Sequence, residues 1–251
     1  MIPEQNNKLY QVVKANLNSQ VFDILKEMIA DQRFNPESYI NVEQLTHELG
    51  VSRTPIWEAI RRLEQEGIVV HTPHKGVKVR ELTREMALEL YMVREVLEGL
   101  AARLGADQAT PPTVEKMETC LARQELSIEQ EDPVAYSRSD YGFHLLVCEA
   151  SGIKLLKEVI EGLRYKALPL AFRLMPHLME FIDFHRGILE AFRLRDGQAA
   201  EVAMQRHDRR MMEIIQTIPW GIEEKSKLHG KSSAPSYLRK IAILGQPPSR
   251  L

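Results

Sequence analysis

Residues 45–82 read LTHELGVSRTPIWEAIRRLEQEGIVVHTPHKGVKVREL, and this stretch decides the fold of the N-terminal part of the chain. Gly50 is the usual residue in the tight turn of a helix-turn-helix. Residues 52–55 (SRTP) are typical of a helix start, because hydroxyl side chains cap helices and proline fits an early helical position. The stretch therefore predicts two helices joined by a tight turn, the second of which ends at Gly67.

A β-hairpin is predicted directly after these helices. Two short β-prone runs, IVVH at 68–71 and VKVR at 77–80, flank a turn at 72–76 that contains a glycine. Three short helices followed by a basic-tipped hairpin form a winged helix. In that fold the third helix lies in the DNA major groove, and the hairpin reaches the neighbouring backbone or minor groove.

The first helix of this domain is predicted upstream, with Ser19 as its cap. Its apolar residues recur at spacings of three and four, and they are Val21, Ile24, Leu25, Met28 and Ile29. Asn41 caps the second helix, with Gln44 at the capping-box spacing. Residues 1–82 are therefore expected to form a winged helix-turn-helix domain.

The composition indicates a cytoplasmic protein with two domains. A chain of 251 residues is long enough for two cores. No stretch approaches the roughly 18 consecutive apolar residues of a membrane span, and the N-terminus does not resemble a secretory signal. Cys120 and Cys148 are the only cysteines, and both are expected to be packed thiols. The net charge is −2, but residues 53–80 carry six basic side chains against three acidic ones, which suits contact with phosphates.

Residues 83–218 show nearly continuous helical periodicity and are expected to form an all-α bundle of six or seven helices. Thr83 caps the first of these helices, whose core face is predicted from a run of apolar residues, namely Met86, Leu90, Val93, Leu97, Leu100 and Leu104. The next helices are predicted at about 111–128, 133–151, 154–173, 176–195 and 197–217. Residues 219–251, with a short helix conceivable at 236–244, are expected to form a mobile tail.

Four polar residues of this bundle form a candidate metal site. Asp140 and His144 are four apart and share one helix face. His185 and His207 lie on the two helices joined by the turn at Asp196, each about 16 Å from that turn at 1.5 Å per residue. If these two helices pack as an antiparallel hairpin, His185 and His207 lie at the same height along it. One carboxylate and three imidazoles suit zinc, nickel or manganese, although any one of them alone is more often an ordinary polar side chain.

The stretch at 45–82 resembles the DNA-binding domain of the GntR family of bacterial regulators, over about residues 19–82. The resemblance implies that the third helix and the wing tip contact operator DNA through Ser52, Arg53, Thr54, Trp57, Arg61, His74, Lys75 and Gly76. Two family arginines align with Trp57 and Glu43, so either the operator sequence is expected to differ or the affinity for it is expected to be lower. Trp57 either stacks on sugars or thymine methyl groups, or packs against a neighbouring element.

The helical part resembles the effector domain of the FadR subfamily of that family. The resemblance rests on DYGFHLLVCEASG at 140–152 and HRGILEAFRLRDGQAAEVAMQRHDRR at 185–210. It implies a six- or seven-helix domain of the FCD type that holds a divalent metal through Asp140, His144, His185 and His207. It also implies that Arg94 pairs with a carboxylate effector. The alternative for Arg94 is a surface ion pair with Glu98 at i+4.

Together these features predict a homodimeric transcriptional regulator, expected to be a repressor, that binds operator DNA under the control of a small carboxylate at or near the metal. The dimer is expected because one winged helix contacts few phosphates. Two alternatives use the same residues. One is a metal-dependent hydrolase or lyase with a metal-activated water, in place of the non-enzymatic function expected here. The other is a regulator that senses the metal ion itself.

Overall fold

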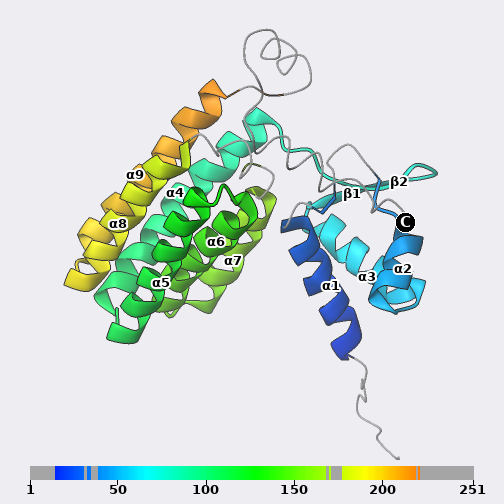
Figure 1. Cartoon of the computed structure of the whole chain (residues 1–251), viewed down its shortest axis with the longest axis horizontal. Coiled ribbons are helices and arrows are strands. Elements are labelled where there is room, and N and C mark those ends of the chain that lie inside the picture. Colours follow the sequence, from blue (N-terminus) through cyan, green and yellow to red (C-terminus); the bar gives the residue numbers. More distant parts are fainter. Residues whose placement is uncertain are drawn as a thin grey trace, which may run out of the picture.

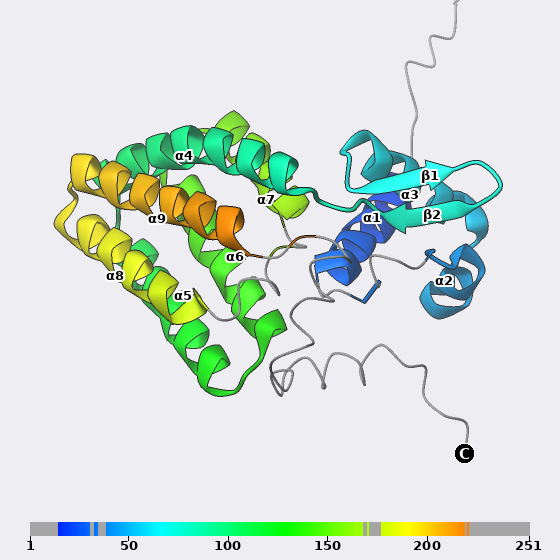
Figure 2. The ribbon, with the colours of Figure 1, turned by 90° about the horizontal axis from the view of Figure 1, so that it is seen from above.

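The computed structural model describes residues 15–30, 33–34, 39–167, 170, 177–218 and 220, which are mainly helical with one two-stranded antiparallel sheet (Figure 1). The elements in chain order are α1 (Ala15–Ala30), α2 (Val42–Leu49), α3 (Arg53–Gln65), β1 (Val69–Thr72), β2 (Gly76–Val79), α4 (Arg84–Asp107), α5 (Pro111–Glu129), α6 (Pro133–Ala150), α7 (Lys154–Ala167), α8 (Leu178–Leu194) and α9 (Gly197–Thr217). Helices α1–α3 and the hairpin lie on one side, and α4–α9 lie on the other (Figures 1 and 2). The predicted fold class is confirmed.

The winged helix forms from the local signals in its sequence. The Asn41 side chain accepts a hydrogen bond from the Gln44 backbone N–H at 3.0 Å, which caps α2. Gly50 ends α2 at φ +63°, in the left-handed region that glycine adopts without strain. Ser52 occupies the N-cap position of α3, but its hydroxyl makes no capping hydrogen bond. In the hairpin, Val69 pairs with Val79, and both side chains join the core beneath α3.

The prediction for α1 was wrong in two details. Ser19 lies inside the helix, which already includes Ala15, so it is not the cap. Ile24 is exposed, whereas Phe22 is buried in the core. Phe22 belongs to the core of the winged helix, and the Arg62 guanidinium of α3 lies over its ring, 3.8 Å from Cζ to the ring centroid.

Helices α5, α6 and α9 begin and end within one residue of their predicted bounds. Side chains of Thr83, Thr110, Asp132 and Asp196 each accept a backbone N–H of the following first turn. Helices α7 and α8 have shorter described spans than predicted, and residues 171–176 lie outside the described part. The predicted tail also lies outside it except for Trp220, whose Nε1 donates to the Ile215 carbonyl at 3.0 Å. No described helix is long and apolar enough to cross a membrane.

The predicted core face of α4 was wrong only in part, because Met86, Leu90 and Leu97 are partly buried and pack against the core. Val93 and Leu100 are 48% and 41% exposed, whereas the fully buried positions are mainly small or polar, namely Ala87, Tyr91, Arg94, Glu98, Gly99, Ala101, Ala102, Gly105 and Ala106. Helices α4 and α9 run side by side (Figure 2). A Cβ on Gly105 would lie 2.9 Å from the Val147 carbonyl oxygen, so only glycine permits this approach of α6. Close packing on several sides therefore selects small residues over leucine.

Candidate metal centre and DNA-binding surface

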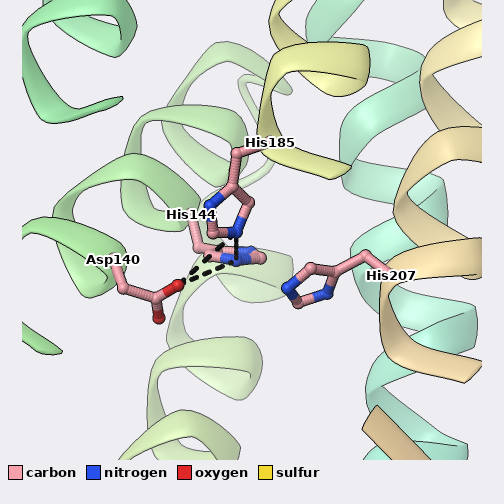
Figure 3. A group of neighbouring side chains, drawn as sticks. All are labelled: Asp140, His144, His185 and His207. Carbon is pink, nitrogen blue, oxygen red and sulfur yellow. Dashed lines mark hydrogen bonds and ion pairs between the residues drawn. The ribbon is translucent and has the colours of Figure 1, made fainter. Parts of the chain in front are cut away.

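Three helices of the bundle bring four potential metal ligands together. Asp140 and His144 come from α6, His185 from α8 and His207 from α9, and one ligand atom of each lies within 4.8 Å of the others (Figure 3). The three histidines are buried, and Asp140 is partly exposed. The structure thus places His185 and His207 side by side, as the helix spacing predicted, and brings Asp140 and His144 to the same point.

The ring nitrogens of the histidines turn toward a common point (Figure 3). His144 Nε2 lies 3.3 Å from His185 Nε2. Asp140 Oδ1 lies 3.7 Å from His144 Nε2 and 3.5 Å from His185 Nε2. Four donor atoms from separate turns of the bundle therefore surround one small volume.

The other ring nitrogen of each histidine has its own acceptor. His185 Nδ1 lies 2.7 Å from Gln124 Oε1, and His207 Nδ1 lies 3.2 Å from Asp208 Oδ1. His144 Nδ1 lies 2.7 Å from Glu98 Oε2, a close contact whose angle departs from that of an ideal hydrogen bond. An acceptor at Nδ1 favours the tautomer whose Nε2 carries a free lone pair, which is the usual arrangement of metal-binding histidines.

Gln124 and Asp208 were not predicted from the sequence as site residues, and Glu98 was expected only as a surface partner of Arg94. Glu98, Gln124 and Asp208 are each at most 1% exposed. Charged or amide side chains are almost never fully buried without partners. Their positions on the buried faces of α4, α5 and α9 could have indicated a role in the site. Which faces of these helices are buried is known only from the packing of the bundle.

Two arginines hold the carboxylates of this centre. Arg164 Nη1 donates to Glu98 Oε2 at 3.0 Å, and its Nη2 donates to Asp140 Oδ2 at 2.6 Å. Arg94 Nε donates to Glu98 Oε1 at 2.6 Å. The ion pair of Arg94 with Glu98 therefore exists, but it is buried rather than on the surface, with Arg94 only 2% exposed.

This network shifts the pKa values of four residues of the site. Burial by itself would raise the pKa of Asp140, but Arg164 and the neighbouring imidazoles outweigh it and lower that pKa to about 2. Burial likewise opposes ionisation of Glu98, but Arg94 and Arg164 hold its pKa well below the usual range. Burial, with Arg164, lowers the pKa of His144, and burial, with His207, lowers that of His185. Charged carboxylates and neutral imidazoles are the forms that bind metal ions.

A small cavity of about 70 Å³ opens beside these residues. Asp140 and His207 line it together with Arg94, Arg164 and Tyr141. The cavity therefore borders the candidate metal ligands on one side and two buried guanidinium groups on another, an arrangement suited to a small anion.

The residues predicted to contact DNA lie on α3 and on the hairpin turn. Arg53, Thr54 and Arg61 are exposed on α3, and Ser52 is exposed at its N-cap position. His74 and Lys75 are exposed at the hairpin turn next to Gly76. His74 has φ +62°. The exposed Arg53 Nη2 lies 3.2 Å from Glu43 Oε1 of α2, so these two side chains form an exposed ion pair.

Trp57 packs within the winged helix, and its contact with DNA stays a prediction. It is partly buried, packs against the winged-helix core and meets the His71 ring of β1 edge to face at a centroid distance of 5.2 Å. The contact joins α3 to the wing.

Comparison with known proteins gives the family. Residues 17–79 match the family "Bacterial regulatory proteins, gntR family", and residues 89–210 match the FCD domain. The chain is 30% identical over 195 residues to the Nta operon transcriptional regulator of Aminobacter aminovorans, covering 75% of this chain and 91% of that protein. It is 24% identical over 205 residues to the HTH-type transcriptional repressor RspR of Escherichia coli K12, covering 80% and 90%.

A solved structure shares the fold. E. coli McbR/YncC superposes with a TM-score of 0.73 at 23% identity, over 80% of this chain and 98% of that one. The matched relatives are transcriptional regulators and not enzymes, which removes the hydrolase or lyase alternative. The chain belongs to the GntR family of bacterial regulatory proteins and carries an FCD domain behind its winged helix.

Proposed function

We propose that this chain is a sequence-specific transcriptional repressor of the FadR subfamily, whose operator binding is controlled by a small carboxylate bound at or near a divalent metal. The observation that carries the proposal is the convergence of His144, His185 and Asp140 while Nδ1 of each histidine faces a buried acceptor. In a polar cluster with a purely structural role, nothing requires the lone pairs of several ring nitrogens to face one point.

The chemistry of the donor set selects the metal class. Three imidazoles and one carboxylate suit zinc, nickel or manganese, and they leave positions open on an octahedral ion. Such an ion supplies a Lewis-acidic centre for an oxygen ligand. Arg94 and Arg164 line the adjoining cavity, where their guanidinium groups favour an anion over a neutral molecule.

Contacts between aromatic rings connect this cavity with the DNA-binding part. Tyr141 lines the cavity, and its ring lies 5.4 Å from that of Tyr165 on α7. Lys26 of α1 lies 3.7 Å above the Tyr165 ring centroid. A ligand that moves Tyr141 would thereby move α1, and a shift of α1 in a homodimer changes the fit of two wings to two half-sites.

The test combines metal and DNA measurements on purified protein. An operator fragment is first selected from a random duplex library with metal-loaded protein. Fluorescence anisotropy then compares operator affinity for stripped protein, for protein loaded with zinc, nickel or manganese, and for loaded protein with candidate carboxylates. We expect carboxylates to weaken operator binding of loaded protein only. A change in affinity with metal alone, and none with carboxylates, would instead favour a regulator that senses the ion.

Variants of the ligands tie the response to the site. His185→Ala and His207→Ala are expected to lose metal binding and the carboxylate response. His177→Ala is the matched control, because this residue precedes α8 outside the cluster. Unchanged metal affinity in both ligand variants would refute the proposed centre.

A further inference from the structure

The three residues that face Nδ1 of the histidines differ in charge. Glu98 and Asp208 present carboxylates, whereas Gln124 of α5 presents a neutral amide. Gln124 is fully buried, with its Oε1 on His185 Nδ1 at 2.7 Å. Its Nε2 has no hydrogen-bond partner in the described part of the chain. A carboxylate at position 124 would keep the contact to His185 and would lose no hydrogen bond there.

The formal charges of the buried cluster do not cancel. Glu98, Asp140 and Asp208 carry three negative charges. Arg94 and Arg164 carry two positive charges and contact these carboxylates. The cluster is therefore −1 with neutral imidazoles and +1 with a divalent ion. A buried net charge is unfavourable until it is neutralised.

We propose that Gln124 is the residue that makes the loaded site anion-selective: its neutral amide leaves the metal-loaded cluster at +1, so that one carboxylate group per ion completes the charge balance. This inference rests on the proposed metal-dependent function. Glutamate at this position would neutralise the loaded cluster and weaken its attraction for an anion.

The inference predicts opposite effects of one substitution on two affinities. In Gln124→Glu, the added negative charge strengthens divalent metal binding and weakens carboxylate binding, each by about tenfold or more. In Gln124→Leu, His185 loses its acceptor, and metal affinity falls by about 10–100-fold. A merely structural role of Gln124 would weaken both kinds of binding in both variants.

The experiment uses the full chain loaded with Co²⁺, whose visible spectrum reports its ligands. Chelator competition gives the Co²⁺ affinity, and titration with acetate followed by the spectrum gives the anion affinity. Acetamide serves as the neutral probe, for which wild type and Gln124→Glu are expected to agree within about twofold because no charge is involved. Thermal unfolding of stripped protein checks that the variants fold.

Gln198→Glu is the matched control, since it adds the same charge at an exposed position in the first turn of α9. We expect it to leave both affinities unchanged. Equal or tighter acetate binding by Gln124→Glu, or an unchanged Co²⁺ affinity, would overturn the role of Gln124 and leave the metal site intact. If wild-type protein binds no Co²⁺, the proposed function fails, and this inference fails with it.

Discussion

The DNA-facing residues of this chain and its candidate metal ligands are assembled in opposite ways. The former lie between Ser52 and Gly76, on one helix and the adjoining turn, and most are exposed. The latter span Asp140 to His207 on three helices, and their histidines are buried. Exposed side chains can change with little effect on folding, whereas each buried charge is tied to several others. The two regions should therefore respond differently to substitution.

The largest effect on stability is expected at Glu98. Glu98→Gln removes the charge that balances Arg94 and Arg164, and loss of one partner of a buried ion pair costs about 3–5 kcal/mol. Glu118→Gln is the matched control because its pair with Arg193 is exposed, which limits the loss to about 1 kcal/mol. Urea unfolding followed by circular dichroism measures both. Equal losses in the two variants would remove the contrast between buried and exposed charges.

The largest effect on DNA binding is expected at Arg53. Arg53→Ala should weaken operator binding by about 1–3 kcal/mol, the contribution of one bidentate guanine contact, while stability changes by less than about 0.5 kcal/mol. Arg62→Ala offers a comparison on the same helix, because Arg62 lies against Phe22 rather than on the predicted DNA face. Stronger loss of operator affinity in Arg62→Ala than in Arg53→Ala would contradict the assigned face of α3.

The two regions should become independent when Tyr165 is replaced. Tyr165→Leu removes the contacts to Tyr141 and Lys26. A typical coupling changes operator affinity by about 5–150-fold when the effector binds. In the variant we expect the carboxylate to leave operator affinity nearly unchanged. Metal affinity and ligand-free operator affinity should stay near the wild-type values. The measurement is operator anisotropy with and without carboxylate. A full response in the variant would exclude this contact as the connection.

The smallest effect is expected at Glu43. Glu43→Gln frees Arg53 from its exposed ion pair and removes a negative charge near DNA phosphates, so operator affinity should rise a few-fold and its salt dependence should steepen. Stability should change by less than about 1 kcal/mol. Lower operator affinity in this variant would mean that Glu43 orients Arg53 or reads a base itself.

Much of the winged helix was predictable because its determinants are local. Asn41 and Gly50 act within one turn of the residues that they cap, and the hairpin follows from two β-prone runs around a glycine. The level placement of His185 and His207 was also predictable, since two long helices joined by a short turn have a fixed rise per residue.

The sequence by itself determined most of the elements, the caps at Asn41, Thr83, Thr110, Asp132 and Asp196, and the identity of the four converging side chains. Only the tertiary structure decided which face of α4 is buried, because close packing against α6 and α9 selects alanine and glycine over the leucines that periodicity favoured. It also decided that Glu98, Gln124 and Asp208 stand behind the histidines. Those contacts join residues far apart in sequence, and their geometry depends on how whole helices pack rather than on any local pattern.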